Sequence, residues 1–264
     1  MPTQSHDPNR RPTKAERRDE DRRRRAELQR QMARKRRTRL WGGAAAVLAG
    51  AAVVGLVVLQ PFAAASPQEL LAQAPAAAKT AGCDAVKTIG AFGGIDDPKD
   101  PKYNDRTHFG PSLPAPPLSA YPSVPPTSGP HDPNSLQGGV YDAPPPIGQA
   151  IHSLEHGGAI VWYAPTVTGA ALEDLTAFYS QKLASQNVGQ DRVIVAPYDY
   201  PDQGEGGHLP SGVEMALVSW HSLQTCAQVS LPAAFDFTSR YASPTFDDRA
   251  YAGRSPEDER GLPF

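Results

Sequence analysis

Proline is concentrated in one stretch of the chain, and this stretch limits the folds that the sequence can adopt. The prolines within residues 91–150 include Pro111, Pro114, Pro116, Pro117, Pro122, Pro125, Pro126, Pro130, Pro133, Pro144, Pro145 and Pro146. Because proline lacks an N–H group and fixes one backbone angle, it disrupts helix interiors and central strands. The stretch therefore predicts neither helix nor central sheet.

Large side chains distinguish this stretch from a flexible linker. Proline-rich composition alone is typical of disordered linkers. Here the prolines are interspersed with residues that linkers seldom carry, namely Tyr103, His108, Phe109, Tyr121, His131 and Tyr141. We therefore expect an ordered but irregular layer of loops that packs on a domain.

Regular structure is predicted after residue 150. Residues typical of strands occupy 159–163, 193–196 and 213–220, and apolar residues recur at helical spacing in 172–183 and 231–241. The predicted fold class is α+β: a small mixed sheet with two helices and a Pro-rich irregular N-terminal loop layer, preceded by one transmembrane helix.

The transmembrane helix is predicted at residues 41–62, whose core, 42–59, carries no charge. About 20 helical residues span the ~30 Å of a bilayer core. Basic residues directly before the segment place its N-terminal end in the cytoplasm. We expect an uncleaved signal anchor. A signal peptide cleaved after Ala65 and a buried soluble helix stay open as alternatives.

The distribution of charge also divides the chain at this apolar segment. Residues 1–39 contain 15 basic and 6 acidic side chains, and the remainder contains 11 basic and 22 acidic ones. The expected regions are a basic, mostly disordered cytoplasmic tail (1–40), the membrane helix (41–62), an Ala/Pro linker (63–82), an extracytoplasmic domain (83–250) and a flexible tail (251–264). We expect the basic tail to contact anionic lipid headgroups of the cell membrane, and no nucleic acid, since no base-reading motif accompanies it.

Two cysteines, Cys83 and Cys226, both follow the apolar segment. Outside the cytoplasm such a pair predicts one disulfide bond. Closing so long a loop stabilises the fold by at most about 4–5 kcal/mol in the chain-entropy model.

Histidines are the most distinctive candidates for a functional site. Six follow the apolar segment: His108, His131, His152, His156, His208 and His221. If residues 149–156 form a helical turn, His152 and His156 project from one side and can chelate one ion. The turn at His131 offers a third ligand and His108 a fourth. An imidazole-rich site outside the cytoplasm suits copper or zinc better than calcium or magnesium.

Two further residues could support such a site. Met215 would add a soft ligand for reduced copper. Glu155 completes the pattern H-x-x-E-H, in which two histidines bind zinc and the glutamate activates water. Gly157 and Gly158 would end the helix that a zinc hydrolase needs, so we do not favour an enzyme. The remaining alternative is an extracytoplasmic interaction module in which the histidines brace loops. Other exported proteins are the expected partners.

Three motifs carry a resemblance to a known family: Val124-Pro125-Pro126-Thr127-Ser128-Gly129-Pro130-His131, Gly139-Val140-Tyr141-Asp142 and His152-Ser153-Leu154-Glu155-His156-Gly157-Gly158. With them the chain resembles, over about residues 80–250, the DUF3105 family of bacterial, mainly actinobacterial, membrane-anchored proteins of unknown function. The resemblance implies that the proline-rich stretch belongs to the domain and that the motif histidines and Glu155 share one site. It implies no activity.

Overall fold

The computed structural model describes residues 65–184 and 191–257. Its helices are α2 (Pro67–Thr80), α3 (Ile147–Glu155), α4 (Ala170–Ala184) and α5 (Leu231–Tyr241). Its strands are β1 (Lys87–Thr88), β2 (Gly139–Val140), β3 (Ala159–Tyr163), β4 (Val193–Pro197), β5 (Met215–Ser219) and β6 (Ser222–Cys226). The predicted cytoplasmic tail (1–40) and membrane helix (41–62) lie outside the described residues. None of the helices within the described ranges is long and apolar enough to span a membrane.

The strands form one six-stranded sheet in the order β1-β6-β5-β3-β4-β2. Strands β3, β4 and β2 run parallel to one another, whereas β5 and β6 pair antiparallel with their neighbours. The predicted α+β class with a mixed sheet is therefore confirmed. Helix α4 connects the parallel strands β3 and β4, which need such a crossover.

The strands predicted at 159–163, 193–196 and 213–220 are confirmed as β3, β4 and β5, and the two predicted helices as α4 and α5. The prediction of only two helices was too low for the described residues. It also left out β1 and β2, which have only two residues each, and β6, whose sequence Ser-Leu-Gln-Thr-Cys carries little strand character.

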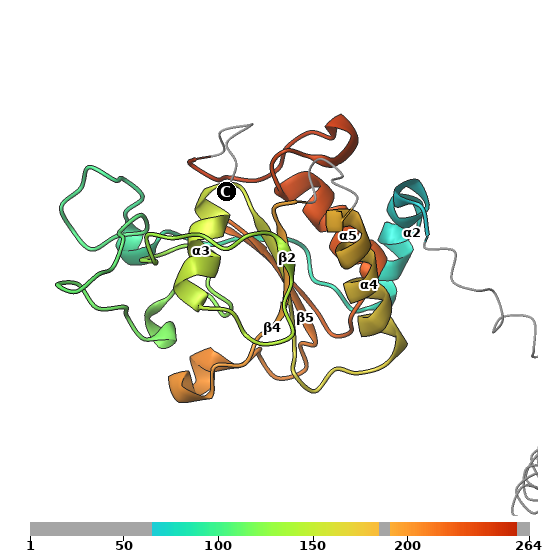
Figure 1. The fold of residues 1–264 in the computed structure, drawn as a ribbon, viewed down its shortest axis with the longest axis horizontal. Coiled ribbons are helices and arrows are strands. Elements are labelled where there is room, and N and C mark those ends of the chain that lie inside the picture. The colour runs from blue at the N-terminus through green and yellow to red at the C-terminus, as the bar shows by residue number, and fades with distance from the viewer. Residues whose placement is uncertain (1–64, 185–190, 258–264) are drawn as a thin grey trace, which may run out of the picture. The chain divides into compact units, whose positions relative to one another are not determined.

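Both faces of the sheet are buried. Successive side chains of a strand point to opposite faces, so Ile160 and Trp162 pack on one side of β3 and Ala159 and Val161 on the other. Figure 1 shows α3 on one side of the sheet and α2, α4 and α5 on the other. We call the side with α2, α4 and α5 the helical face, and the side with α3 and the proline-rich loops the loop face.

The helical face begins with α2, which corrects the predicted linker at 63–82. Leu70 and Ala74 of this helix are buried, and α2 packs against α5. Ser66 and Glu69 form a capping box at its first turn, with Ser66 N–H donating to Glu69 Oε2 at 2.7 Å. A capping box is a local signal of a helix start. The folded domain therefore begins near residue 66 rather than at residue 83.

The predicted disulfide bond is present. Cys83, just after α2, is joined to Cys226 at the end of β6, and 143 positions separate the two in sequence. Met215 lies opposite Cys226 in the sheet and belongs to the same buried apolar cluster on the helical face.

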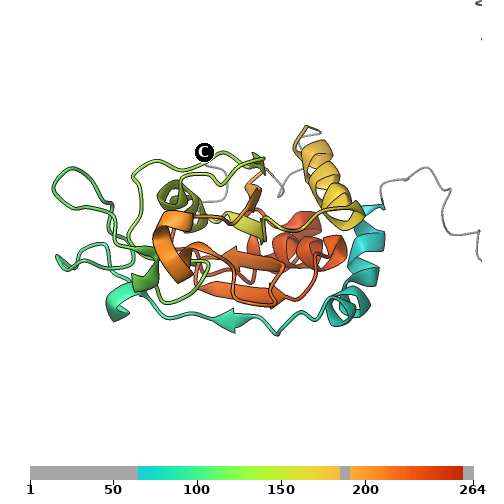
Figure 2. The ribbon, with the colours of Figure 1, turned by 90° about the horizontal axis from the view of Figure 1, so that it is seen from below.

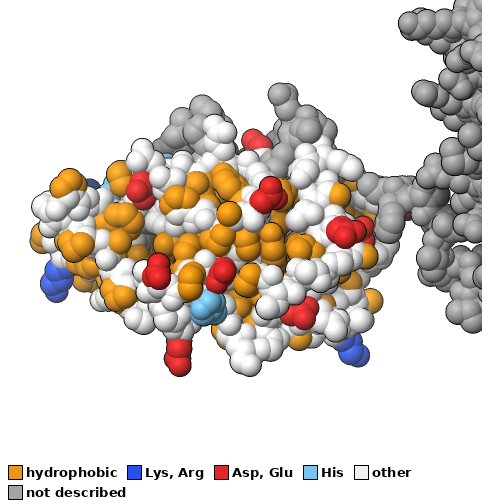
Figure 3. All heavy atoms as spheres, turned by 60° about the horizontal axis from the view of Figure 1, so that its bottom comes forward, with side chains coloured by type: hydrophobic (Ala, Val, Ile, Leu, Met, Phe, Trp, Pro, Cys, Tyr) orange, Lys and Arg blue, Asp and Glu red, His pale blue; other side chains and the backbone are white. Residues whose placement is uncertain are grey.

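The loop face is irregular but ordered, as predicted from its aromatic and histidine content. Residues 125–131 are all buried, although they contain three prolines and no helix or strand. Figure 2 shows these loops extending from the end of the sheet away from α2. On the surface in Figure 3, hydrophobic side chains form a band with acidic side chains spread along it.

Candidate metal centre

Helix α3 positions two of the candidate ligands. Its apolar residues Ile151 and Leu154 are buried against the sheet. His152 and Glu155, three positions apart and hence neighbours on the helix surface, face the proline-rich loops. The helix ends where the sequence predicted, because Gly157 adopts a positive φ of 87° and its N–H donates to the carbonyl of Leu154.

Two loop segments that lie side by side supply the other histidines. The N–H of His131 donates to the carbonyl of Thr107, and the N–H of Phe109 donates to the carbonyl of His131, each at 2.9 Å. This pairing places the rings of His108 and His131 next to each other and against His152. The centroid of the His152 ring lies 5.0 Å from that of His108 and 4.9 Å from that of His131.

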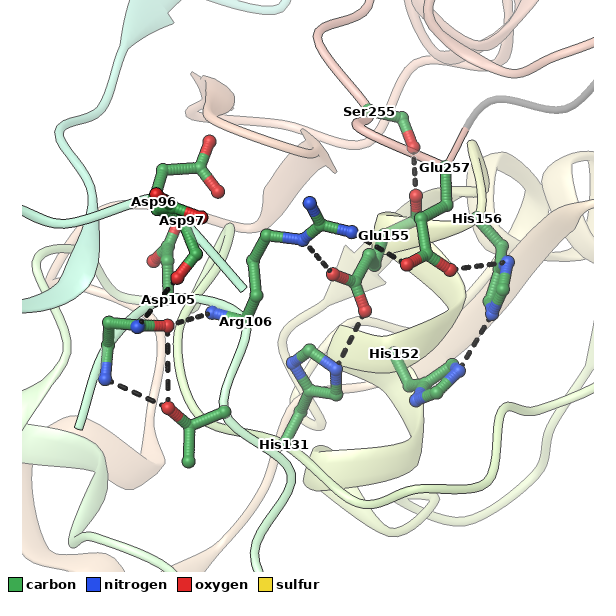
Figure 4. Close-up of polar contacts among 12 residues, drawn as sticks. Asp96, Asp97, Asp105, Arg106, His131, His152, Glu155, His156, Ser255 and Glu257 are labelled. Carbon is green, nitrogen blue, oxygen red and sulfur yellow. Dashed lines mark hydrogen bonds and ion pairs between the residues drawn. The ribbon is translucent and has the colours of Figure 1, made fainter. Parts of the chain in front are cut away.

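The four side chains converge on one point. One ligand atom from each of His108, His131, His152 and Glu155 lies within 4.8 Å of the corresponding atoms of the others. His131 Nε2 is 2.9 Å from Glu155 Oε2, as Figure 4 shows, and His108 Nε2 is 3.9 Å from it. Three of the four residues are buried, and His108 is exposed. The cluster could therefore hold one metal ion that is reached from the side of His108.

Backbone carbonyls determine which ring nitrogens face the cluster. His131 Nδ1 lies 2.8 Å from the carbonyl oxygen of Gly129, and His152 Nδ1 lies 2.7 Å from that of Asp132. A carbonyl only accepts, so both Nδ1 atoms carry a proton and Nε2 is the nitrogen of each ring that remains to bind a metal. Metal-binding histidines commonly donate their second N–H in this way, which fixes the tautomer and the ring orientation.

The charges of the site favour a neutral His152 beside an ionised Glu155. Burial and the neighbouring His131 lower the pKa of His152 to about 4. Burial also lowers the pKa of His108. For Glu155, burial favours a higher pKa, but the contacts with His131 and Arg106 outweigh it and lower the pKa to about 2. Metal ligands must be deprotonated, and near neutral pH His108, His152 and Glu155 are.

Arg106 and Glu257 extend the site, and the sequence did not point to either. Arg106 Nε donates to Glu155 Oε1 at 2.7 Å, and its Nη2 donates to Glu257 Oε1 at 2.6 Å (Figure 4). The hydroxyl of Ser255 donates to the carbonyl of Glu155. The segment that contains Ser255 and Glu257 therefore lies over the C-terminal end of α3. These contacts join residues 49 to 151 positions apart, so no local pattern reveals them.

His156 lies beside the cluster rather than among the converging ligand atoms. Its Nε2 is 2.8 Å from His152 Nε2, and its Nδ1 is 3.6 Å from Glu257 Oε2. The sequence predicts His156 as a ligand ahead of His108 and Glu155 as a supporting residue. The geometry reverses this order, because the chain brings His108 and Glu155 to the common point.

The prediction that Met215 supports the site is wrong. Met215 is fully buried on the helical face, whereas α3 and the histidines lie on the loop face. Side chains of β5 alternate between the two faces, and Met215 points away from the site.

Fold and site together define an α+β protein with a buried His/Glu cluster that could hold a metal ion. The chain belongs to the family described as protein of unknown function (DUF3105), which matches residues 118–254, slightly more than half of the chain. The match includes His131, His152, Glu155 and His156. It begins later than the expected residue 80, so His108 lies before it. None of the curated proteins and none of the solved structures matches this chain.

Proposed function

We propose that this protein binds one divalent transition-metal ion at His108, His131, His152 and Glu155. The observation that carries the proposal is the pair of Nδ1–carbonyl hydrogen bonds of His131 and His152. They fix the orientation of both rings, and leave Nε2 of each to bind a metal, before any ion arrives. Such preorganisation reduces the cost of binding.

Copper is the favoured ion and zinc the second candidate. The four converging side chains offer three imidazoles and one carboxylate, and Met215, which would have supplied sulfur for reduced copper, lies on the other face of the sheet. This donor set suits an oxidised, divalent ion. At a given site of nitrogen and oxygen ligands, Cu²⁺ generally binds more tightly than Zn²⁺.

We place this site outside the cytoplasm, on a domain anchored to the cell membrane by residues 41–62. The positive charge of residues 1–39 and the disulfide bond between Cys83 and Cys226 support this placement. There the protein would bind, store or deliver metal to other exported proteins. The exposure of His108 leaves a route for exchange.

A metal-binding measurement on the full-length chain in mild detergent tests the proposal. The chelator-treated protein is equilibrated with Cu²⁺ or Zn²⁺, and bound metal is measured for the native chain and for His131→Gln and His152→Gln. We expect one copper to be lost in both variants, and nitrogen coupling in the Cu²⁺ paramagnetic resonance spectrum to weaken. His208→Gln is the matched control, since His208 is exposed and contacts only Asp199 among the acidic groups described. Unchanged copper binding in both variants would overturn the proposal.

The alternative is an interaction module in which the histidines brace the loops. Its support is that the Nδ1 hydrogen bond of His152 ties α3 to the loops, and that of His131 braces the turn at Gly129, without any ion. In that case the glutamine variants lower stability, and the native chain gains no thermal stability from copper or zinc. A zinc hydrolase has weaker support, because Arg106 and His131 hold both oxygens of Glu155, which the H-x-x-E-H pattern would use as a base.

A further inference from the structure

A second group of ligand-capable side chains lies beside the first. Asp96, Asp105 and His221 each place one ligand atom within 4.8 Å of the other two. His221 Nε2 is 2.9 Å from Asp105 Oδ2 and 3.4 Å from Asp96 Oδ2. Figure 4 shows the two carboxylates on one side of Arg106, with the His/Glu cluster on the other. The sequence alone gives His221 no particular role.

Asp105 is the anchor of this group. It is completely buried, and its Oδ1 accepts the N–H of Phe92 at 2.7 Å. Its Oδ2 points toward His221 and Asp96 and has no hydrogen-bond partner among the described residues. Its backbone N–H donates to the carbonyl of Ile95, which holds the neighbouring Asp96 close by.

His221 is fixed in the same way as the histidines of the first cluster. Its Nδ1 donates to the carbonyl of Ile89 at 2.9 Å, so Nε2, which faces the carboxylates, is the nitrogen that remains to bind a metal. His221 lies at the turn between β5 and β6 with a positive φ of 56°. That backbone conformation is uncommon for a residue other than glycine, and the turn aims the ring into the group.

The charges of the two groups differ. Glu155 of the first cluster is paired with Arg106. Within the described residues, neither Asp96 nor Asp105 forms an ion pair with a lysine or arginine, and His221 is the partner of both. Buried carboxylates are normally paired or coordinate a metal. Two carboxylates around one imidazole leave negative charge that a cation would balance.

We propose that Asp96, Asp105 and His221 form a second metal site that holds a divalent cation. One nitrogen and two oxygen donors suit Zn²⁺ or Mn²⁺, and three protein ligands leave a position for water. Mg²⁺ and Ca²⁺ prefer all-oxygen sites and bind more weakly here. This site does not depend on the first. Because Asp105 directly precedes Arg106, metal at the second site also steadies the segment that supplies Arg106 and His108 to the first.

The competing explanation is a simple ion pair, in which a protonated His221 neutralises Asp105. Burial favours a lower pKa for His221, but its contacts with Asp105 outweigh this and raise the pKa. The two explanations differ in metal content, which can be measured directly.

The test uses the full-length chain in detergent, freed of metal by a chelator and dialysed against Zn²⁺ or Mn²⁺. We expect the native chain to bind two equivalents of Zn²⁺. Asp96→Asn and His221→Asn should abolish binding of the second equivalent or lower its affinity. The affinity should fall by at least about 10–100-fold, which is the effect of losing an outer-sphere partner. Asparagine is chosen at position 221 because it tolerates positive φ. Asp96 is partly exposed, so its variant keeps the fold even if Asp105→Asn does not.

His152→Gln and His208→Asn complete the design. His152→Gln removes only the equivalent bound at the first cluster, and His208→Asn binds as the native chain does. If the native chain binds one equivalent of Zn²⁺ and both Asp96→Asn and His221→Asn still bind it, the second site is overturned and the first stays intact. If the native chain binds one equivalent and only those two variants lose it, the second site is supported and the first is overturned. No bound Zn²⁺ or Mn²⁺ overturns the second site.

Discussion

The two faces of the sheet are covered by different kinds of structure. On the helical face, α2, α4 and α5 bury an apolar cluster that includes Leu175, Phe178 and Phe235. On the loop face, α3 is the only α-helix among the residues that the structure describes, and proline-rich loops lie beside it. Both groups of ligand-capable side chains lie in the loop segments and at the ends of elements beside them.

The difference shows what irregular backbone provides. A helix uses its own carbonyls for its internal hydrogen bonds, so a helical layer has few to offer to side chains. Prolines lack an N–H group, and the loops around them leave carbonyls free. The carbonyls of Ile89, Gly129 and Asp132 accept from His221, His131 and His152 and fix their tautomers. We therefore expect the helical face to determine stability and the loop face to determine metal binding.

Phe235→Ala should have the largest effect on stability and none on metal binding. Phe235 is completely buried on α5, and its ring packs edge-to-face against Phe178 and Phe246. Removing a buried phenylalanine costs about 3–5 kcal/mol. Denaturant unfolding of the metal-free chain measures the loss, and dialysis of the folded variant measures bound metal. Phe246→Ala, at a partly buried position, is the control with a smaller loss. Reduced metal stoichiometry in folded Phe235→Ala would contradict the separation of the two faces.

The disulfide bond should contribute the next largest share of stability. It joins residues 143 positions apart and ties the end of α2 to β6. The double variant Cys83→Ala/Cys226→Ala should lose about 2–4 kcal/mol, mainly because its unfolded chain is less constrained. Unfolding with and without reductant checks this. Reductant should lower the native midpoint to that of the variant and leave the variant unchanged. If the unfolding midpoint of the native chain stays unchanged after its thiols are shown to be reduced, the disulfide does not stabilise the fold.

Acid should weaken the loop face first. His131, His156 and Glu155 face His152, whose pKa in the folded chain is about 4, against 6.5 for an unperturbed histidine. As the pH falls from 6.5 to 4, His152 binds a proton in the unfolded chain but not in the folded chain. The free energy of unfolding therefore falls. The loss is on the order of 2–3 kcal/mol.

The unfolding free energy of the metal-free chain, measured between pH 7 and pH 4, checks this. His152→Gln should show a flatter profile over that interval. A second loss should follow between pH 4.5 and 2, because Arg106 and His131 lower the pKa of Glu155 and this stabilisation disappears when the carboxylate is protonated. An unaltered profile in His152→Gln would assign the acid sensitivity to other groups.

The regular part of the fold could be predicted from the sequence because its signals are local. The periodic apolar residues of α4 and α5 and the β-branched residues of β3 and β4 lie within single elements. Ser66 and Glu69 form a local capping box at the start of α2, but the Ala/Pro composition around them is also typical of a linker, so the sequence does not predict this helix.

The site could be predicted only in part, for the same reason. His152 and Glu155 belong to one helical turn, and His131 belongs to a neighbouring motif. Arg106, Glu257 and the second group depend on contacts between distant segments. Asp105 and His221 are far apart in the sequence, and each stands in a stretch without a recognisable motif. The sequence also does not show which face of the sheet carries the histidines. It therefore could not show that Met215 points to the opposite face.

Gly148→Ala should have the smallest effect on stability, and its sign is diagnostic. Alanine inside a helix is normally more favourable than glycine by about 1 kcal/mol. At Gly148 of α3, however, a Cβ atom would lie 2.3 Å from the Phe109 ring and 3.1 Å from the backbone nitrogen of Asp132. The ring can move, but displacing Asp132 shifts the carbonyl that orients His152. Overpacking costs about 1–3 kcal/mol, so we expect a net loss of about 1 kcal/mol together with weaker copper binding.

Unfolding and copper titration of Gly148→Ala and of Gly90→Ala, where a Cβ meets nothing within 4 Å, measure both effects. Stabilisation of Gly148→Ala with native copper affinity would show that the close approach of the loops to α3 does not position the site.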